Sequence, residues 1–546
     1  MTFSPAIRSH LTHIALLLLV FAVCECFVYP TIESSLNDDW SYKHSVTYLH
    51  ETGKIDIGYW PAMSLVAHIF WGNLFVSLFG DSHFVLRCST LCLSAFTIVL
   101  LYSLSFRYYG SLRASLLTTL FLIFNPLWFL LSNSFMTDVP FLFWTMLGIY
   151  CAEKMIMGGR YFYVIGFSIA CVQSILIRQF GTALPASFLI FALIAYLIKR
   201  INIRQLGIFL IPVCLSVITY VAFENWIPGH LPEVSAYQSA SDLTKDLSGL
   251  FQRSSETFVY RFSQTLFYLG LFMSPFCVSG AYRSLKDRSW VQRLIVLVPA
   301  LAVVFFMIPQ IVGFPIGNSF YNCGLGLQSL YDVTRLQTNT SHTYSTAFEF
   351  LVEFLGSLGG ISLSVLVIGG IQSFITRLLT KQKIHLFKVF LALFALAYFL
   401  LLCISPFFFD RYTLPLLLPI LLLCKVNISS KNPVAVIAGA YLFLMSCFSV
   451  LATKDYFNWH EARVALIDKA LKEEKPAEEI NGGFEYVAET FYGGSWWSRW
   501  VGYDTPYKVT CGPLPHHHRV DYVAYRRYVP YQMDTVFLYQ RVLSSP

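Results

Sequence analysis

Charged side chains are scarce in this sequence. They make up 13% of its 546 residues, and 56% of the residues are hydrophobic, whereas about 25% charged residues is usual in soluble domains. A soluble fold of this length could not bury so much apolar surface, so most of the chain is expected to lie in lipid. The net charge of +7 is modest, and the basic residues gather in short loops rather than in patches suited to nucleic acid.

Other features are missing as well. The 13 cysteines include no C-x-x-C pair, and most lie in apolar stretches as small buried side chains. Cys323 and Cys511 fall in expected outer segments, where a disulfide is an open alternative. The first apolar run, 11–29, has no small-x-small cleavage site, which predicts an uncleaved span rather than a signal peptide. The consecutive histidines 516–518 cannot all face one ion, so we expect an exposed loop and no metal.

Long apolar runs are abundant. About thirteen of them have roughly the 17–25 residues that a membrane-spanning helix needs. The sequence shows no internal repeat. We therefore predict a polytopic α-helical membrane protein with spans at 11–29, 84–105, 112–132, 138–156, 161–179, 182–198, 206–224, 263–282, 291–312, 357–375, 386–404, 411–425 and 433–452.

Loop charge predicts the orientation. If the N-terminus is inside, the inner loops hold most lysines and arginines, including Lys199, Arg200 and Arg204. The short outer turns then hold little positive charge beyond Arg178 and Arg411. This asymmetry obeys the positive-inside rule and supports about thirteen transmembrane helices with the tail outside. An error of two spans would leave the tail on the same side.

Two domains follow from this layout. Residues 453–546 form a polar tail in which a helix near 454–474 and strands near 522–525 and 535–539 predict a small extracytoplasmic α/β domain. Within 60–79, interrupted apolar residues predict one or two amphipathic helices in the interface. The transmembrane domain, 1–452, is expected to carry outer loops at 30–83, 225–260 and 313–350.

An adjacent pair of acids, Asp38 and Asp39, follows the first span. Acids beside a bilayer are costly and so call for a reason. One is a catalytic base for an acceptor hydroxyl, with repulsion between the two carboxylates raising one pKa. The alternative is that Asn37, Asp38 or Asp39 caps a helix beginning at Trp40.

Three further charges are candidates. Asp138 starts the fourth span, where Thr137 or Asp138 before Pro140 could also be an N-cap. Arg178, at an outer end, could bind a phosphate, or it could reach toward lipid headgroups. Arg411 is similar but has Asp410 beside it as a pairing partner, so Arg178 is preferred for the phosphate.

Several motifs, in order, resemble the GT-C superfamily of membrane glycosyltransferases, closest to family 39. That family includes protein O-mannosyltransferases and the aminoarabinose transferase that modifies lipid A. The stretch from Trp459 to Glu485 also resembles bacterial members with an outer C-terminal domain. The motifs are Asp38-Asp39-Trp-Ser-Tyr42, Thr137-Asp-Val-Pro140, Arg178-Gln179-Phe and Asp410-Arg-Tyr-Thr-Leu-Pro415.

The resemblance implies a GT-C fold and site roles. The family's first-loop motif is Asp-Glu, one residue, then Arg-Tyr; here Asp38 and Tyr42 match, Asp39 replaces Glu and Ser41 replaces Arg. Asp38 would then be the base with Asp39 helping, and Tyr42 and Gln179 would bind substrate. The donor would be a polyprenyl-phosphate sugar, without a nucleotide sugar or other cofactor.

Together these features predict a glycosyltransferase of the inner (plasma) membrane. It would act on its extracytoplasmic face, invert the sugar, and use a glycan, lipid or protein as acceptor, with Asp138 shaping the pocket. A transporter or flippase of a lipid-linked sugar is the first alternative, although it predicts mid-span charges and matching halves. A surface-polysaccharide polymerase or ligase and a non-catalytic scaffold are the others.

Overall fold

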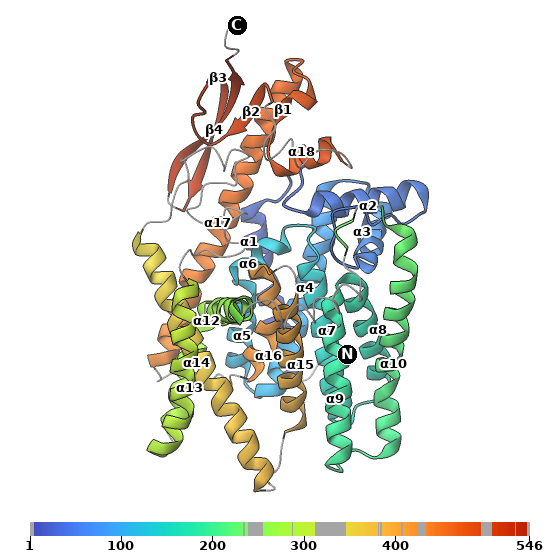
Figure 1. Cartoon of the computed structure of the whole chain (residues 1–546), viewed down its shortest axis with the longest axis vertical. Coiled ribbons are helices and arrows are strands. Elements are labelled where there is room, and N and C mark those ends of the chain that lie inside the picture. The colour runs from blue at the N-terminus through green and yellow to red at the C-terminus, as the bar shows by residue number, and fades with distance from the viewer. Residues whose placement is uncertain are drawn as a thin grey trace.

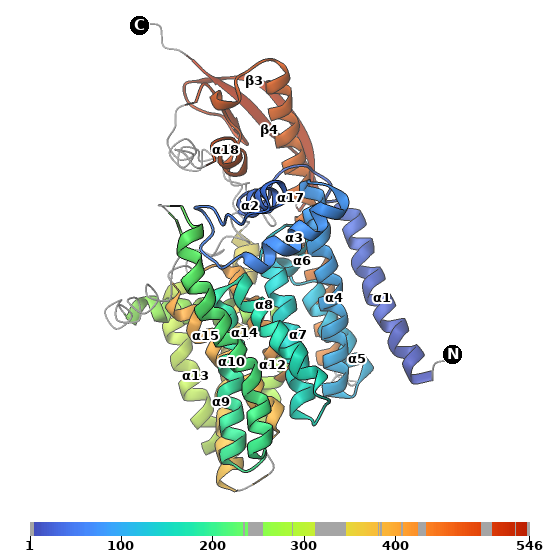
Figure 2. The ribbon, with the colours of Figure 1, turned by 90° about the vertical axis from the view of Figure 1, so that its right-hand side faces the viewer.

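In the computed structural model, a bundle of long helices carries a small β-sheet at one end (Figure 1). The two termini lie far apart, with the C-terminus beyond the sheet and α1 along one side of the bundle (Figure 2). The structure describes residues 5–232, 235–237, 255–286, 288–311, 346–380, 382, 385–405, 408–423, 433–492, 505–529 and 531–542.

The polytopic membrane fold is confirmed. In the described part of the chain, nine helical segments are long and apolar enough to cross a bilayer, or ten if one bent pair counts as a span. Every predicted span overlaps a helix, but the number thirteen is not confirmed. The helices of these nine segments are α1 (Pro5–Val28), α4 (His83–Tyr109), α7 (Asp138–Ile156), α9 (Ala183–Leu197, preceded by η1, Gln179–Thr182), α10 (Ile203–Trp226, followed by η2, Ile227–His230), α12 (Ser255–Lys286), α14 (Thr346–Leu379), α15 (Leu386–Ile404) and α17 (Pro433–Lys472).

Three predicted spans differ from simple long helices. The run 112–132 is bent by 65° between α5 (Leu112–Ile123) and α6 (Pro126–Ser132). The bend occurs because Asn125 caps α6, accepting from the backbone N–H of Leu127 at 3.1 Å, and proline follows at the first helical position. The other two are α8 (Phe162–Ile177) and η3 (Asp410–Thr413) with α16 (Leu414–Leu423). The predicted span 291–312 is the single helix α13 (Trp290–Ile311).

The first outer segment contains two helices that pack on each other, α2 (Asp39–Thr52) and α3 (Val66–Phe79). One helix, α3, lies within 60–79, where one or two amphipathic helices were predicted; α3 is apolar rather than amphipathic. Most of the predicted loops 225–260 and 313–350, and Cys323, lie outside the described residues. Cys511 is described and half-buried, and its expected disulfide partner is outside the described residues, so the disulfide stays an open alternative.

The tail is built on α17, whose 40 residues run from the bundle into the tail without a break. The predicted boundary at 452/453 therefore falls inside a helix. Three predicted tail elements are confirmed, since α17 covers 454–472 and the two strands lie in β3 and β4. The small elements are η4 (Ala477–Glu479), α18 (Phe484–Thr490), β1 (Ile480–Asn481), β2 (Tyr507–Thr510), β3 (His517–Tyr528) and β4 (Tyr531–Arg541), with the strands in the order β1-β2-β4-β3.

One prediction in the tail is wrong. His517 and His518 belong to strand β3 rather than to a loop, because each pairs with a residue of β4. His516 precedes the strand with a positive φ of 59°. Among the residues that the structure describes, no group of three or more histidine, cysteine or acidic side chains could hold a metal ion.

Candidate active site

Asp38 lies just before α2, in the N-cap position, but its side chain makes no capping hydrogen bond. Its carboxylate instead accepts from Trp60 Nε1 at 3.0 Å and from Arg411 Nη2 at 3.3 Å. The side chain is 16% exposed, so it is the member of this pair that solvent reaches, since the Arg411 side chain is 1% exposed. The capping alternative for Asp38 therefore does not describe the contacts that its carboxylate makes.

Asp38 is the first of four charged side chains that form an acid–arginine row: Asp38, Arg411, Asp138 and Arg178. Arg411 Nε lies 3.5 Å from Asp138 Oδ2, and the same oxygen lies 2.8 Å from Arg178 Nη2. The last three side chains are 4% exposed or less. Burying a charge is costly unless it is paired, so alternation of two acids with two arginines makes the row electrically balanced.

The row joins segments that are far apart in the sequence. Asp38 comes from the first outer segment, Asp138 begins α7, Arg178 ends α8, and Arg411 lies in η3. Asp410 binds the backbone next to it. Its Oδ1 accepts from the Arg411 backbone N–H at 2.7 Å, which shapes the turn of η3.

Arg178 is held on several sides. Its Nε and Nη2 donate to Thr137 Oγ1 at 2.9 and 2.7 Å, and its guanidinium lies 4.9 Å from the centre of the Tyr412 ring. The same ring lies 5.6 Å from the Arg411 guanidinium. Thr137 and Tyr412 therefore fix the spacing of the two arginines. Both residues stand in the motifs noted in the sequence, but no pattern there assigned them a contact.

Asp39 points away from the row. Its Oδ1 accepts from the Leu36 backbone N–H at 2.6 Å and its Oδ2 from that of Phe135 at 3.1 Å. Burial raises its pKa to about 6. Successive residues at a helix start project in different directions, so Asp39 binds backbone while Asp38 faces the arginine. In the structure Asp39 thus fastens the loop to the segment before α7.

The pKa of Asp38 is raised chiefly by burial. Arg411 and the hydrogen bond from Trp60 act in the opposite direction, and repulsion from Asp138 and Glu485 adds to the increase. The repelling carboxylates are therefore distant in sequence, and the expected repulsion from Asp39 is not among these causes. Trp60 was not a candidate because a single tryptophan in an outer segment carries no distinguishing pattern.

Tyr42 and Gln179 lie near the row without an ion pair or hydrogen bond to it. The Tyr42 hydroxyl donates to Met63 Sδ at 3.7 Å, and Gln179 Nε2 donates to the Ala62 carbonyl at 3.2 Å. Tyr42 is 1% exposed. Both side chains therefore hold the Ala62–Met63 segment that follows Trp60.

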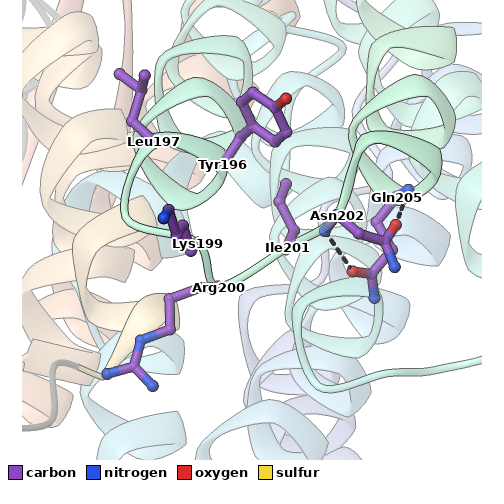
Figure 3. A pocket seen from close by; sticks show the side chains of 7 residues that line it. All are labelled: Tyr196, Leu197, Lys199, Arg200, Ile201, Asn202 and Gln205. Carbon is purple, nitrogen blue, oxygen red and sulfur yellow. Dashed lines mark hydrogen bonds between the residues drawn. The ribbon is translucent and has the colours of Figure 1, made fainter.

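A hollow of about 580 Å³ lies elsewhere, at the turn between α9 and α10 (Figure 3). Asn202 and Gln205 exchange side-chain to backbone hydrogen bonds there as a capping box. The turn is at the end of the bundle opposite the sheet (Figure 1). Its lining residues include Lys199 and Arg200 but no acid, so it supplies neither a base nor a part of the row.

Comparison with known proteins gives a family for part of the chain. Residues 66–223 match the sequence model of the family described as dolichyl-phosphate-mannose-protein mannosyltransferase. No curated protein matches the chain in sequence.

Solved structures with some likeness to the chain include ArnT from Cupriavidus metallidurans in the apo state, with 13% identity, full coverage of both chains and a TM-score of 0.43. ArnT bound to undecaprenyl phosphate has 14% identity, 85% and 81% coverage of the two chains, and a TM-score of 0.40. The archaeal oligosaccharyltransferase AglB from Archaeoglobus fulgidus, in complex with an inhibitory peptide and a dolichol-phosphate, has 13% identity, 90% and 60% coverage, and a TM-score of 0.39.

The matched segment runs from α3 to α10 and contains both Asp138 and Arg178. Over this segment, the chain is similar to the family of dolichyl-phosphate-mannose-protein mannosyltransferases.

Proposed function

We propose that this protein transfers a sugar from a polyprenyl-phosphate-linked donor to an acceptor hydroxyl, with inversion at the sugar carbon and Asp38 as the base. The observation that carries the proposal is the contact between the partly exposed Asp38 and the buried Arg411. A carboxylate beside a fixed cation provides the two groups that such a transfer needs, a proton acceptor and a partner for a leaving phosphate.

The reaction uses the two groups in one displacement. Asp38 takes the proton of the acceptor hydroxyl while the acceptor oxygen bonds to the anomeric carbon. The bond from that carbon to the phosphate oxygen breaks, and polyprenyl phosphate departs with the electron pair. Because attack and departure occur on opposite faces of the carbon, the product has the inverted configuration.

The arginines have different parts in this proposal. Arg411 lies between two carboxylates, at 3.3 Å from Asp38 and 3.5 Å from Asp138. A donor phosphate can compete for it, and Asp38 becomes a stronger base once its cation is shared. Arg178, which Asp138 and Thr137 hold, adds positive potential to the same site. Asp138 thereby orients both guanidinium groups without taking part in proton transfer.

A donor with a lipid tail suits the setting. The long apolar helices supply a lipid-facing surface, and α2, which directly follows Asp38, lies toward the end of the bundle that carries the sheet (Figure 1). We assign that end to the extracytoplasmic side of the inner (plasma) membrane because the basic turn with Lys199 and Arg200 lies at the other end. The acceptor is a glycan, a lipid or a protein. No further cofactor is part of the proposal.

The test is turnover of labelled polyprenyl-phosphate sugars by the purified protein and by Asp38→Asn. We expect Asp38→Asn to lose at least about 100-fold in turnover, in line with general-base catalysis, and to retain binding of polyprenyl phosphate. Asp81→Asn is the matched control, since Asp81 belongs to the same outer segment but pairs with Lys43 at the surface.

Full activity of Asp38→Asn would remove Asp38 as the base. If the wild type binds polyprenyl phosphate but transfers and hydrolyses none of the labelled sugars, the transferase proposal fails. Movement of the intact lipid-linked sugar across proteoliposomes would then favour the flippase alternative.

A further inference from the structure

We infer that the tail domain is a working part of the active site: two glutamates of α18, Glu485 and Glu489, position the loop that carries Asp38. This inference rests on the proposed function, because it assigns a role in placing the proposed base. The two glutamates are four residues apart, so they lie on the same face of the helix. We call them the α18 clamp.

Glu485 contacts the residue next to Asp38. Its Oε1 accepts from the Asn37 backbone N–H at 3.1 Å, and its Oε2 lies 2.8 Å from Arg463 Nη1. The side chains of Glu485 and Arg463 are 9% and 3% exposed. Asn37 has a φ of 59°, the left-handed conformation that asparagine adopts more readily than most residues. A buried, charge-assisted bond therefore holds the loop where it turns into Asp38.

Glu489 holds the loop two residues earlier. It accepts from the Ser35 hydroxyl, and its Oε1 lies 3.2 Å from His83 Nε2 at the start of α4. Between the two glutamates, Val487 and Ala488 pack against Trp40, which is 2% exposed. The clamp thus combines two polar contacts, to Ser35 and Asn37, with an apolar contact to Trp40. These residues lie on both sides of Asp38 in the sequence.

The opposite side of the loop is bound from within the bundle. Arg87 of α4 donates to the carbonyls of Pro30, Ile32 and Ser34. The loop is therefore held between α4 and the tail. Without α18, the residues that flank this segment, Ser34 and Asp39, would keep their contacts with the bundle. Ser35 and Asn37 themselves would lose the hydrogen bonds that they make with the two glutamates.

The expected effect of losing that support is on placement. Displacing a catalytic group by about 1 Å can cost roughly 100-fold in rate. The two arginines proposed to bind the phosphate are held by a different residue, Asp138 of α7. Glu485→Ala should therefore lower kcat by about 10–100-fold and change the donor KM by less than about threefold. Glu485→Gln keeps an oxygen for the Asn37 N–H and should recover part of the loss.

A measurement independent of turnover tests the clamp itself. Hydrogen exchange of the purified full-length protein, read on peptides that cover residues 34–42, should become at least about tenfold faster in Glu485→Ala and in Glu489→Ala. The control is Glu461→Ala, which removes an exposed carboxylate of α17. Glu489→Ala, at a half-exposed position, serves if Glu485→Ala does not fold.

The outcomes separate the two proposals. Unchanged exchange in both variants overturns the clamp. Faster exchange with an unchanged kcat overturns the positioning role. A wild type that turns over no lipid-phosphate sugar overturns the proposed function and the placement of a base with it, while the exchange result still decides whether α18 holds the loop.

Discussion

Asp138 should be the most sensitive position of the acid–arginine row for stability. Two acids balance two arginines there, so Asp138→Asn leaves one buried positive charge uncompensated. At an effective dielectric constant of about 20, charges 2.8 Å apart attract by roughly 6 kcal/mol. Part of this attraction offsets the cost of burying the two ions. The net loss on removing one partner of a buried pair is about 3–5 kcal/mol.

The assay is reversible unfolding of purified protein in mixed micelles, comparing Asp138→Asn, Arg178→Gln and the double variant. The double variant should cost no more than either single one, because it removes the charge imbalance. Lys43→Gln is the control: it breaks a pair at 3.4 Å whose side chains are about a quarter exposed, worth about 0.2–1 kcal/mol. A loss in Asp138→Asn as small as that in the control, or additive losses in the double variant, would refute the reasoning.

Two further predictions concern the base. Burial raises the pKa of Asp38, and the base must be deprotonated, so kcat/KM should rise with pH through a pKa above the ordinary aspartate value. Arg411→Gln should move that rise to higher pH, because Arg411 lowers the pKa of Asp38. A profile of kcat/KM against pH measures the shift, and a profile that does not move would exclude the contact. Trp60→Phe removes the N–H that donates to Asp38 and should lower turnover about tenfold, the equivalent of one hydrogen bond to a charged group. The control is Trp71→Phe, in which α3 loses a donor to the Ser89 carbonyl of α4; this variant should retain wild-type turnover. Equal losses in both variants would contradict the role of Trp60.

The membrane architecture could be read from the sequence because bilayer thickness imposes a simple rule. Nearly every apolar run of sufficient length became a helix. The exceptions arise from local chemistry: the Asn125-Pro126 step bends one run, and Pro433–Lys472 continues past its apolar part because nothing in it breaks a helix before residue 472.

The four charged residues of the acid–arginine row could be selected from the sequence, but their pairing could not. Intramembrane or interfacial charges are rare enough to stand out, so Asp38, Asp138, Arg178 and Arg411 could be selected one at a time. Their pairing depends on how α7, α8 and η3 pack, and spacing along the sequence carries no information on that. The same limit hid Glu485, which looked like one of many acids in a polar tail.

The unbroken run of α17 has a mechanical consequence. A rigid rod of 40 residues is about 60 Å long, and each residue turns it by about 100°. The helix starts in lipid and ends at the sheet. The orientation of the tail domain therefore depends on the rotation and tilt of a single membrane helix. Adding or deleting one residue in α17 would rotate the tail domain about the helix axis to another side of the bundle. The length of α17 is therefore as strict a requirement as its composition.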